Sequence, residues 1–280
     1  MGLFFEILQF VIYVGLIVLI SKYILVKNLR NLAENLKLKS KTVGDIAGIA
    51  TSAPELLTIC ASSYKGLVSA SIYNVLSSNI INLIQYYGAI VLNKNQKSLK
   101  NIAIKVDLFL VIITIILPII FILLKSQLQI AMVPILIFLY CGFQKINNNA
   151  HKLYLKDEDK EIEEILKKED RWEIGNKAKI ARNVGVLVIA GILLFVIGNL
   201  LGNTLETLCY RFNVPQIIVG IILGFATSIP ELITFLESQR HHAKSENNIL
   251  GVVEATNNLL TSNMMNLFLI QSIGILILTW

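Results

Sequence analysis

Long apolar runs separated by short charged connections make up most of the chain. Runs long enough to cross about 30 Å of hydrocarbon as helices occupy residues 3–26, 43–63, 67–92, 102–124, 183–205, 214–236 and 249–279. A further run, 128–144, is borderline in length. With that run counted, the pattern predicts an all-α polytopic membrane protein of about eight transmembrane helices.

The composition supports this class. Hydrophobic residues make up 55% of the 280 residues and charged residues only 16%, whereas about a quarter of a soluble domain is charged. These figures exclude a disordered chain, a collagen and a soluble enzyme with a polar surface. The net charge of +6 does not indicate a nucleic-acid partner, because the basic residues cluster between apolar runs. The expected surroundings are the lipid bilayer.

The density of basic residues alternates from one connection to the next. The connections after the first, third and seventh spans are rich in lysine and arginine, and those between them carry few. Basic residues favour the cytosolic side, so we expect a non-cytosolic N-terminus and a cytosolic loop at 145–182.

The segment 145–182 has a composition of its own, because it holds 19 of the 44 charged residues. It is too short for a folded regulatory domain. We interpret it as a charged cytosolic linker between an N-terminal membrane half, 1–144, and a C-terminal membrane half, 183–280. A helix that docks a partner is the alternative.

An internal repeat links the two halves. VGDIAGIATSAPELLT at 43–58 matches VGIILGFATSIPELIT at 219–234 at 11 of 16 positions, and NVLSSNIINL at 74–83 matches NLLTSNMMNL at 258–267 at 6 of 10. The copies, 43–92 and 214–279, are each predicted to form a helix, a turn and a helix. The number of spans between them makes them cross the membrane in opposite directions. Inverted repeats of this kind bring equivalent residues together near the midplane, where secondary transporters bind their substrates.

Each repeat carries one acidic residue in the middle of a span, Glu55 in the first and Glu231 in the second. An acidic residue at this depth costs about 2.5 to 3.5 kcal/mol on insertion, so its presence indicates a function. Thr51 and Thr227 stand four residues earlier, on the same helix face. A proline directly before each glutamate predicts a kink that turns backbone oxygens toward the site.

The repeats contribute further hydroxyl and amide groups around these acids. Two glycines at equivalent positions allow close approach of an ion or a helix. The hydroxyl and amide residues are Ser52, Ser228, Ser78, Ser262, Asn82 and Asn266, and the glycines are Gly48 and Gly224. Such oxygens suit calcium or sodium, and the set holds no thiolate or imidazole for zinc or copper. Helix packing alone explains small polar residues but not two midplane acids.

Other polar residues are expected outside this site. Asp45 and Glu254 stand near the cytosolic ends of their spans, which is typical of interfacial residues. His241 and His242 fall in the insertion between the two parts of the second repeat. We expect them in a loop and do not assign them a metal.

The repeated residues resemble the two alpha-repeats of the calcium/cation antiporter superfamily, of the sodium/calcium exchanger type, with motifs G-T-S-x-P-E and G-S-N-x-x-N. Here the motifs read ATSAPE and ATSIPE, then SSNIIN and TSNMMN. The resemblance implies a secondary active antiporter that exchanges calcium for sodium by alternating access, without a cofactor and without enzymatic activity. It makes Glu55 and Glu231 the calcium-coordinating acids and gives backbone oxygens to Thr51 and Thr227. It places flanking sodium sites at Gly48, Ser52, Ser78, Asn82, Gly224, Ser228, Ser262 and Asn266.

Departures from the family pattern leave two alternatives open. Asn266 stands where many relatives have an aspartate, which favours a calcium/proton antiporter. The family's usual glycine before Asn258 is Asn257, and the C-terminal half is expected to lack the last two of the family's ten helices. These features favour a degenerate, non-transporting membrane subunit.

Overall fold

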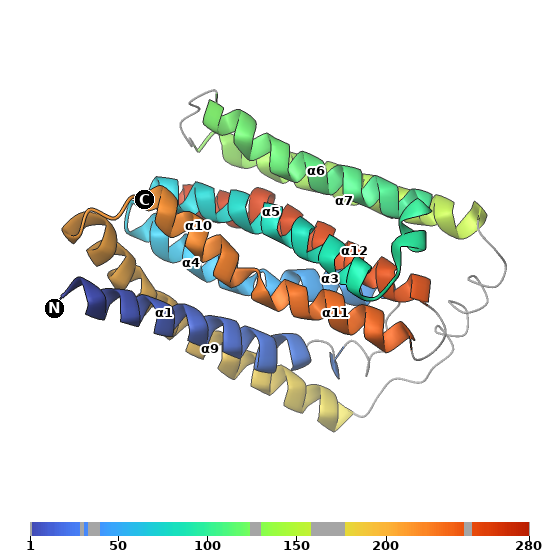
Figure 1. The fold of residues 1–280 in the computed structure, drawn as a ribbon, viewed down its shortest axis with the longest axis horizontal. Coiled ribbons are helices and arrows are strands. Elements are labelled where there is room, and N and C mark those ends of the chain that lie inside the picture. The colour runs from blue at the N-terminus through green and yellow to red at the C-terminus, as the bar shows by residue number, and fades with distance from the viewer. Residues whose placement is uncertain are drawn as a thin grey trace.

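The computed structural model describes residues 2–28, 31–32, 40–123, 130–157, 177–243 and 248–279, and all its described elements are helical (Figure 1). In chain order they are α1 (Leu3–Ile20), η1 (Ser21–Val26), α3 (Ser40–Thr51), α4 (Ala53–Tyr64), α5 (Val68–Leu92), η2 (Gln96–Lys100), α6 (Ile102–Leu123), α7 (Met132–Asp157), α9 (Lys177–Glu206), η3 (Thr207–Arg211), α10 (Gln216–Thr227), α11 (Ile229–Ala243), α12 (Asn248–Met264), η4 (Met265–Ile270) and α13 (Gln271–Leu278).

Seven segments of the described chain are long and apolar enough to cross a membrane. They are Leu3–Ile24, Ser40–Tyr64, Val68–Leu92, Ile102–Ile120, Ala181–Arg211, Gln216–His242 and Ile249–Leu278. Each coincides with one predicted span. The borderline run 128–144 lies mostly in α7, which is outside these seven but packs alongside α6 (Figure 1). Helix α7 continues to Asp157, so the expected linker begins as helix, and its central part, 158–176, lies outside the described residues.

Both repeats contain a helix that is interrupted near its middle. Helix α3 gives way to α4 at Ser52, and α10 gives way to α11 at Ser228, with nearly the same backbone angles at both serines (φ −77°, ψ −1° and φ −79°, ψ −1°). Proline two residues later cannot donate an N–H and clashes with the carbonyl four residues before it. The predicted kinks are therefore confirmed, two residues before each proline.

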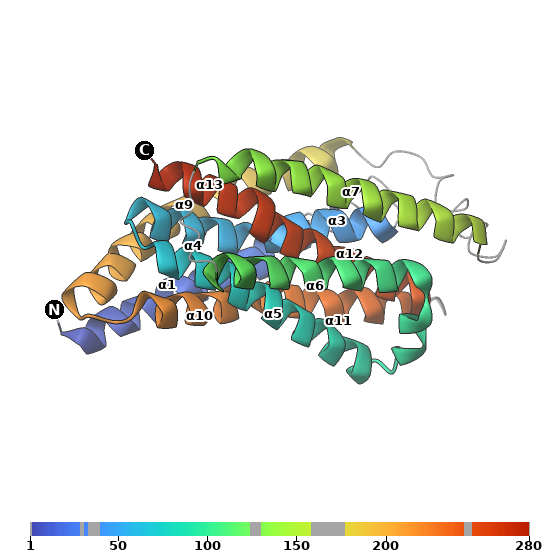
Figure 2. The ribbon, with the colours of Figure 1, turned by 90° about the horizontal axis from the view of Figure 1, so that it is seen from above.

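The two repeats run in opposite directions and interlock. Helix α10 packs along α5, and α12 packs along α3, so that each interrupted helix contacts the other repeat (Figures 1 and 2). Glycine makes the close crossings possible. A Cβ on Gly48 would lie 2.8 Å from the backbone oxygen of Asn258, and one on Gly224 would lie 2.6 Å from that of Asn74. The predicted inverted repeat is confirmed.

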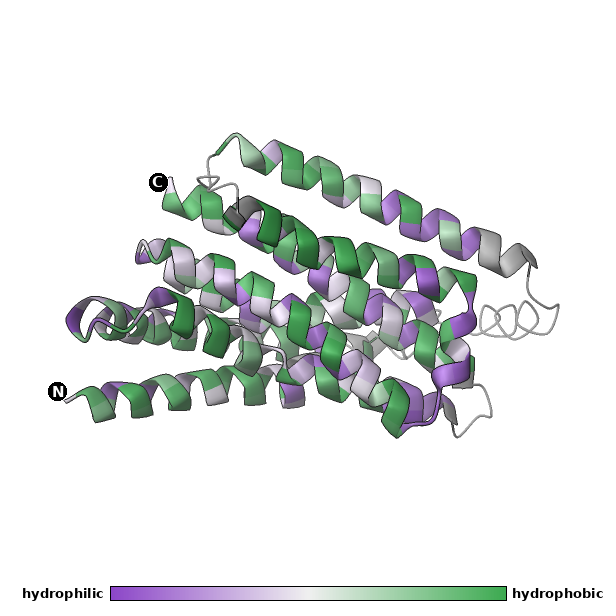
Figure 3. Cartoon of the chain, turned by 45° about the horizontal axis from the view of Figure 1, so that its top comes forward, coloured by the Kyte–Doolittle hydropathy of each residue, from purple (hydrophilic) through white to green (hydrophobic). Residues whose placement is uncertain are grey.

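Apolar clusters flank this interlocked centre on two sides. One gathers on α5, α6, α7 and α12, and the other on α1, α9 and α10. Figure 3 shows hydrophobic residues along most of α1, and polar residues on the inner helices and toward one end of the bundle. Large side chains such as Phe138 and Phe195 are exposed on the outside. A lipid-facing shell around a polar centre is the arrangement that a bilayer favours.

Candidate cation-binding site

All twelve residues predicted for the site are buried in the centre of the bundle. They come from the ends of α3 and α10, the serines that directly follow, the first turns of α4 and α11, the middle of α5, the end of α12 and the start of η4. The set is Gly48, Thr51, Ser52, Glu55, Ser78, Asn82, Gly224, Thr227, Ser228, Glu231, Ser262 and Asn266.

The two carboxylates stand in the first turns of half-helices. Glu55 lies in the first turn of α4 and Glu231 in the first turn of α11, where the positive end of the helix dipole favours a negative charge. Both side chains are fully buried. Glu231 Oε1 accepts a hydrogen bond from Ser262 Oγ at 2.9 Å. Its Oε2 and both carboxylate oxygens of Glu55 have no hydrogen-bond partner among the described residues.

Three asparagine side chains have amide oxygens that accept no hydrogen bond from the described residues. Oδ1 of Asn74, Asn82 and Asn266 is buried and has no hydrogen-bond partner in the described part of the chain. The amide of Asn74 is oriented by Thr58, because its Nδ2 donates to Thr58 Oγ1 at 2.7 Å. Buried acceptors without donors are costly, and a bound cation supplies the missing partner. Carboxylate and amide oxygens are ligands that calcium and sodium prefer.

The serines at the helix interruptions join the repeats. Ser52 Oγ can donate its one proton to the carbonyl of Gly48 at 2.8 Å or to Ser262 Oγ at 3.1 Å. Ser228 Oγ can donate its one proton to the carbonyl of Gly224 at 2.7 Å or to that of Ser78 at 3.5 Å. The bonds within each interrupted helix are equivalent, whereas across the repeats Ser52 meets a hydroxyl group and Ser228 a backbone carbonyl.

Some of these predicted residues are hydrogen-bonded to one another, and others are not. Ser52, Ser262 and Glu231 form one chain of hydrogen bonds, and Asn266 Nδ2 donates to Ser78 Oγ at 3.4 Å. Three others connect through residues outside the predicted set or within their own helix. Thr51 Oγ1 donates to Asn258 Oδ1 at 3.3 Å, Asn82 Nδ2 to Asn263 Oδ1 at 3.1 Å, and Thr227 Oγ1 to the carbonyl of Leu223 at 2.9 Å.

Two supporting threonines were not predicted for the site. Thr58 orients Asn74, and its equivalent Thr234 accepts a hydrogen bond from Asn258 Nδ2. Both stand at the last position of the 16-residue repeat. Their duplication was therefore a usable signal, although they lie outside the motif that carries the acids.

Two expectations for residues outside the site were wrong. Glu254 is buried rather than interfacial, because α11 and α12 pack together: its Oε1 accepts from Ser238 Oγ at 2.6 Å, and its Oε2 lies 3.1 Å from His242 Nε2. His241 and His242 belong to the last turn of α11, not to a loop, since the insertion extends that helix. Asp45 lies apart from the carboxylates, paired with Lys41 at 2.9 Å.

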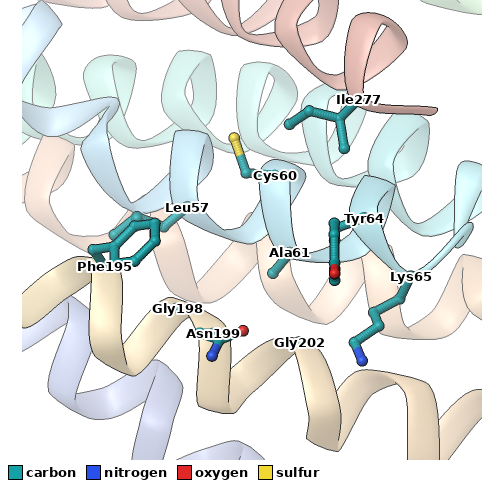
Figure 4. Close-up of a pocket in the computed structure, with 10 residues that line it drawn as sticks. All are labelled: Leu57, Cys60, Ala61, Tyr64, Lys65, Phe195, Gly198, Asn199, Gly202 and Ile277. Carbon is teal, nitrogen blue, oxygen red and sulfur yellow. The ribbon is translucent and has the colours of Figure 1, made fainter. Parts of the chain in front are cut away.

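A separate cavity lies on the outer side of the bundle, between α4 and α9. It measures about 410 Å³ and is lined mainly by apolar side chains, among them Leu57 and Phe195 (Figure 4). Gly198 and Gly202 bring α9 close to Leu57 and Ala61 beside it, as small residues spaced by four do in membrane helices. With few polar groups in its lining, this cavity does not suit a bare cation.

An inverted repeat of membrane-spanning helices, each copy interrupted beside a buried carboxylate, defines the class of protein. It is a multi-pass integral membrane protein with the architecture of secondary transporters.

The family follows from comparison with known sequences. The family model described as "Sodium/calcium exchanger protein" matches residues 6–146 and 182–280. The chain therefore belongs to the sodium/calcium exchanger family. A search of curated protein sequences gave no match.

Solved structures of the sodium-calcium exchanger NCX_Mj have a similar fold. The structure soaked with 2.5 mM Na⁺ and 10 mM Sr²⁺ is 19% identical, with a TM-score of 0.53, over 99% of this chain and 83% of that chain. The structure soaked with 2.5 mM Na⁺ and 0.1 mM Ca²⁺ is 21% identical, with a TM-score of 0.52 and the same coverage. At this identity the likeness establishes the fold.

Proposed function

We propose that the protein is a secondary active antiporter that exchanges calcium for sodium across a membrane by alternating access. Membership of the sodium/calcium exchanger family supports cation transport as the general function. The observation that carries the proposal is the buried pair Glu55 and Glu231, one from each repeat, together with buried amide oxygens of both repeats that lack donors in the described chain. Such a group of hard oxygens matches the ligands of calcium.

The proposed roles follow the position of each group. Glu55 and Glu231 coordinate calcium, with backbone oxygens from Thr51 and Thr227. The glycine, serine and asparagine residues of the predicted set line the flanking sodium sites. In the proposed orientation, the N-terminus is non-cytosolic and 145–182 is a cytosolic linker between the two membrane halves.

Charge explains why exchange is coupled. With both glutamates ionised, the unloaded site holds two buried negative charges, and uncompensated buried charge is strongly unfavourable. One calcium ion or several sodium ions offset it. The protein therefore changes between inward-open and outward-open states chiefly when loaded. Helices α1 and α9, which pack against each other at the edge of the bundle, are the proposed moving elements.

Calcium-45 uptake into proteoliposomes tests this proposal. With sodium inside and none outside, we expect uptake that collapses when the sodium gradient is dissipated. Glu55→Gln and Glu231→Gln each remove a charge with little change of shape and should lower uptake at least tenfold. Glu206→Gln is the matched control, because Glu206 is half-exposed and paired with Lys65 at the surface. Uptake that persists in both site variants would overturn the assigned site.

The same vesicles separate the alternative functions. Asn266 in place of an acid favours proton coupling, which predicts uptake driven by a pH gradient without sodium. A non-transporting subunit predicts no uptake and no calcium binding by calorimetry. Either result would replace sodium/calcium exchange as the function.

A further inference from the structure

A second buried polar cluster lies between α6, α7 and α12 and contains none of the residues assigned to cations. Asp107 of α6 is fully buried. Its Oδ1 accepts from Asn147 Nδ2 at 2.8 Å, and its Oδ2 lies 2.9 Å from His151 Nε2, both on α7. Asn257 of α12 completes the cluster, because its Oδ1 accepts from Asn147 Nδ2 at 3.3 Å.

Two features indicate that this cluster has a function. Asp107 lies in the membrane-spanning segment Ile102–Ile120, where an ionisable side chain is unfavourable without a role. The cluster also breaks the symmetry of the repeat. The offset that pairs Asn258 with Asn74 pairs Asn257 with Tyr73, so the amide that the second repeat gives to this cluster has no counterpart in the first. Helix packing by itself does not require a histidine and an aspartate here.

We propose that Asp107 and His151 form a proton-binding site that sets the position of α12. In the neutral pair, His151 Nε2–H donates to Asp107 Oδ2. A proton on Nδ1 converts this hydrogen bond into an ion pair, which is stronger in a poorly solvated site. Protonation therefore tightens α7 against α6, and Asn147 carries the change to Asn257.

The connection from Asn257 to the cation site is short. The next residue, Asn258, accepts a hydrogen bond from Thr51 at 3.3 Å, and its carbonyl packs against Gly48. A shift of α12 therefore changes the contact between α12 and α3 at Gly48. This last step rests on the proposed function, whereas proton binding by the pair does not.

Other ionisable groups on the neighbouring elements have partners of their own. Tyr86 of α5 shares a hydrogen bond of 2.7 Å with Thr256. Glu254 of α12 bonds to Ser238, and Asp45 of α3 pairs with Lys41. Lys145 and Lys152 of α7 are exposed. Asp107 is thus the acid that contacts His151 directly.

Histidine NMR tests the proton site without any cation. The chain has three histidines, so ¹³C-labelled protein in nanodiscs gives few imidazole signals, and His151→Gln identifies one. We expect this signal to shift when the imidazole takes up a proton. In Asp107→Asn its midpoint should move to lower pH, because the carboxylate that stabilises the imidazolium is gone. His242→Gln should leave the midpoint unchanged. A His151 signal that does not titrate, or that is unaffected by Asp107→Asn, would overturn the site.

Calorimetry then tests the link to α12. Calcium affinity is measured at pH 6 and pH 8 in the parent chain and in His151→Gln. Protonation of the glutamates affects both proteins. We therefore compare, between the parent chain and His151→Gln, the ratio of the calcium affinity at pH 8 to that at pH 6. We expect the two ratios to differ by about threefold or more, and Asp107→Asn provides the same comparison if His151→Gln does not fold. Equal ratios would overturn the link. A parent chain that binds no calcium would refute the proposed function, while the NMR result would still decide the proton site.

Discussion

Asn79 and Asn263 exchange hydrogen bonds at the centre of the bundle. Asn79 Nδ2 donates to the backbone carbonyl of Asn263 at 3.2 Å, and Asn263 Nδ2 donates to that of Asn79 at 3.1 Å. The residues are equivalent in the two repeats, so this pair joins α5 to α12 at the pseudo-two-fold axis.

Alanine at these positions is expected to weaken the crossing of α5 and α12. Asn79→Ala and Asn263→Ala should each lower the free energy of unfolding by about 1 kcal/mol. The double variant should lose less free energy of unfolding than the sum of the two single losses, because both amides stabilise the same helix crossing. Unfolding by SDS titration measures this. Asn93→Ala is the control, since Asn93 donates within its own helix to Ala89. Strict additivity would show that the two bonds act independently.

A methyl group on the crossing glycines is expected to force the repeats apart. Gly48→Ala and Gly224→Ala would place Cβ 2.8 Å and 2.6 Å from backbone oxygens of Asn258 and Asn74. Overpacking of this kind costs about 1 to 3 kcal/mol and should also lower calcium uptake. Gly15→Ala, which meets nothing within 4 Å, should be neutral in thermal unfolding and in transport. Normal stability in both site variants would contradict this packing.

Thr58→Val is expected to weaken calcium binding without touching a ligand. Valine keeps the shape of threonine but removes the acceptor of Asn74 Nδ2. That buried amide can then turn its donors toward the carboxylates, in competition with the cation. We expect calcium affinity by calorimetry to fall about threefold to tenfold, or about 0.6 to 1.4 kcal/mol. Thr114→Val is the control, because Thr114 Oγ1 donates to the carbonyl of Val111 in its own helix. Equal affinity in parent and Thr58→Val would exclude an orienting role.

Asn266→Asp is expected to strengthen calcium binding at neutral pH and to make it more sensitive to acid. Asn266 Oδ1 is buried without a donor in the described chain, and the substitution adds a third carboxylate about one helical turn after Ser262, which contacts Glu231. Added negative charge attracts a divalent cation, and we expect about a tenfold gain, or about 1.4 kcal/mol.

Like charges favour protonation, so this gain should shrink as the pH falls from 8 to 6. Calorimetry across that range measures both effects, with Asn93→Asp as a control outside the site. An unchanged affinity would place Asn266 away from the bound ion.

Which helices form, and where the acids lie along them, could be predicted from the sequence. The length of each apolar run predicted its span, and the kinks at Ser52 and Ser228 followed from the prolines nearby. The duplicated block around Glu55 and Glu231 predicted the inverted repeat. These features depend on local composition and on one internal comparison, so they need no knowledge of packing.

Other features were decided by contacts between distant parts of the chain. Glu254 is buried because α11 packs on α12, and His151 meets Asp107 across 44 residues of sequence. The oxygens of Glu55 and Asn74 that lack donors could be identified only after every neighbouring donor had been placed. The sequence by itself determined the helices, the repeat and the positions of the acids, because the length of an apolar run and the duplication of a motif are properties of the linear sequence. Only the tertiary structure decided which buried groups meet, because helix packing sets the distance and direction of each hydrogen bond.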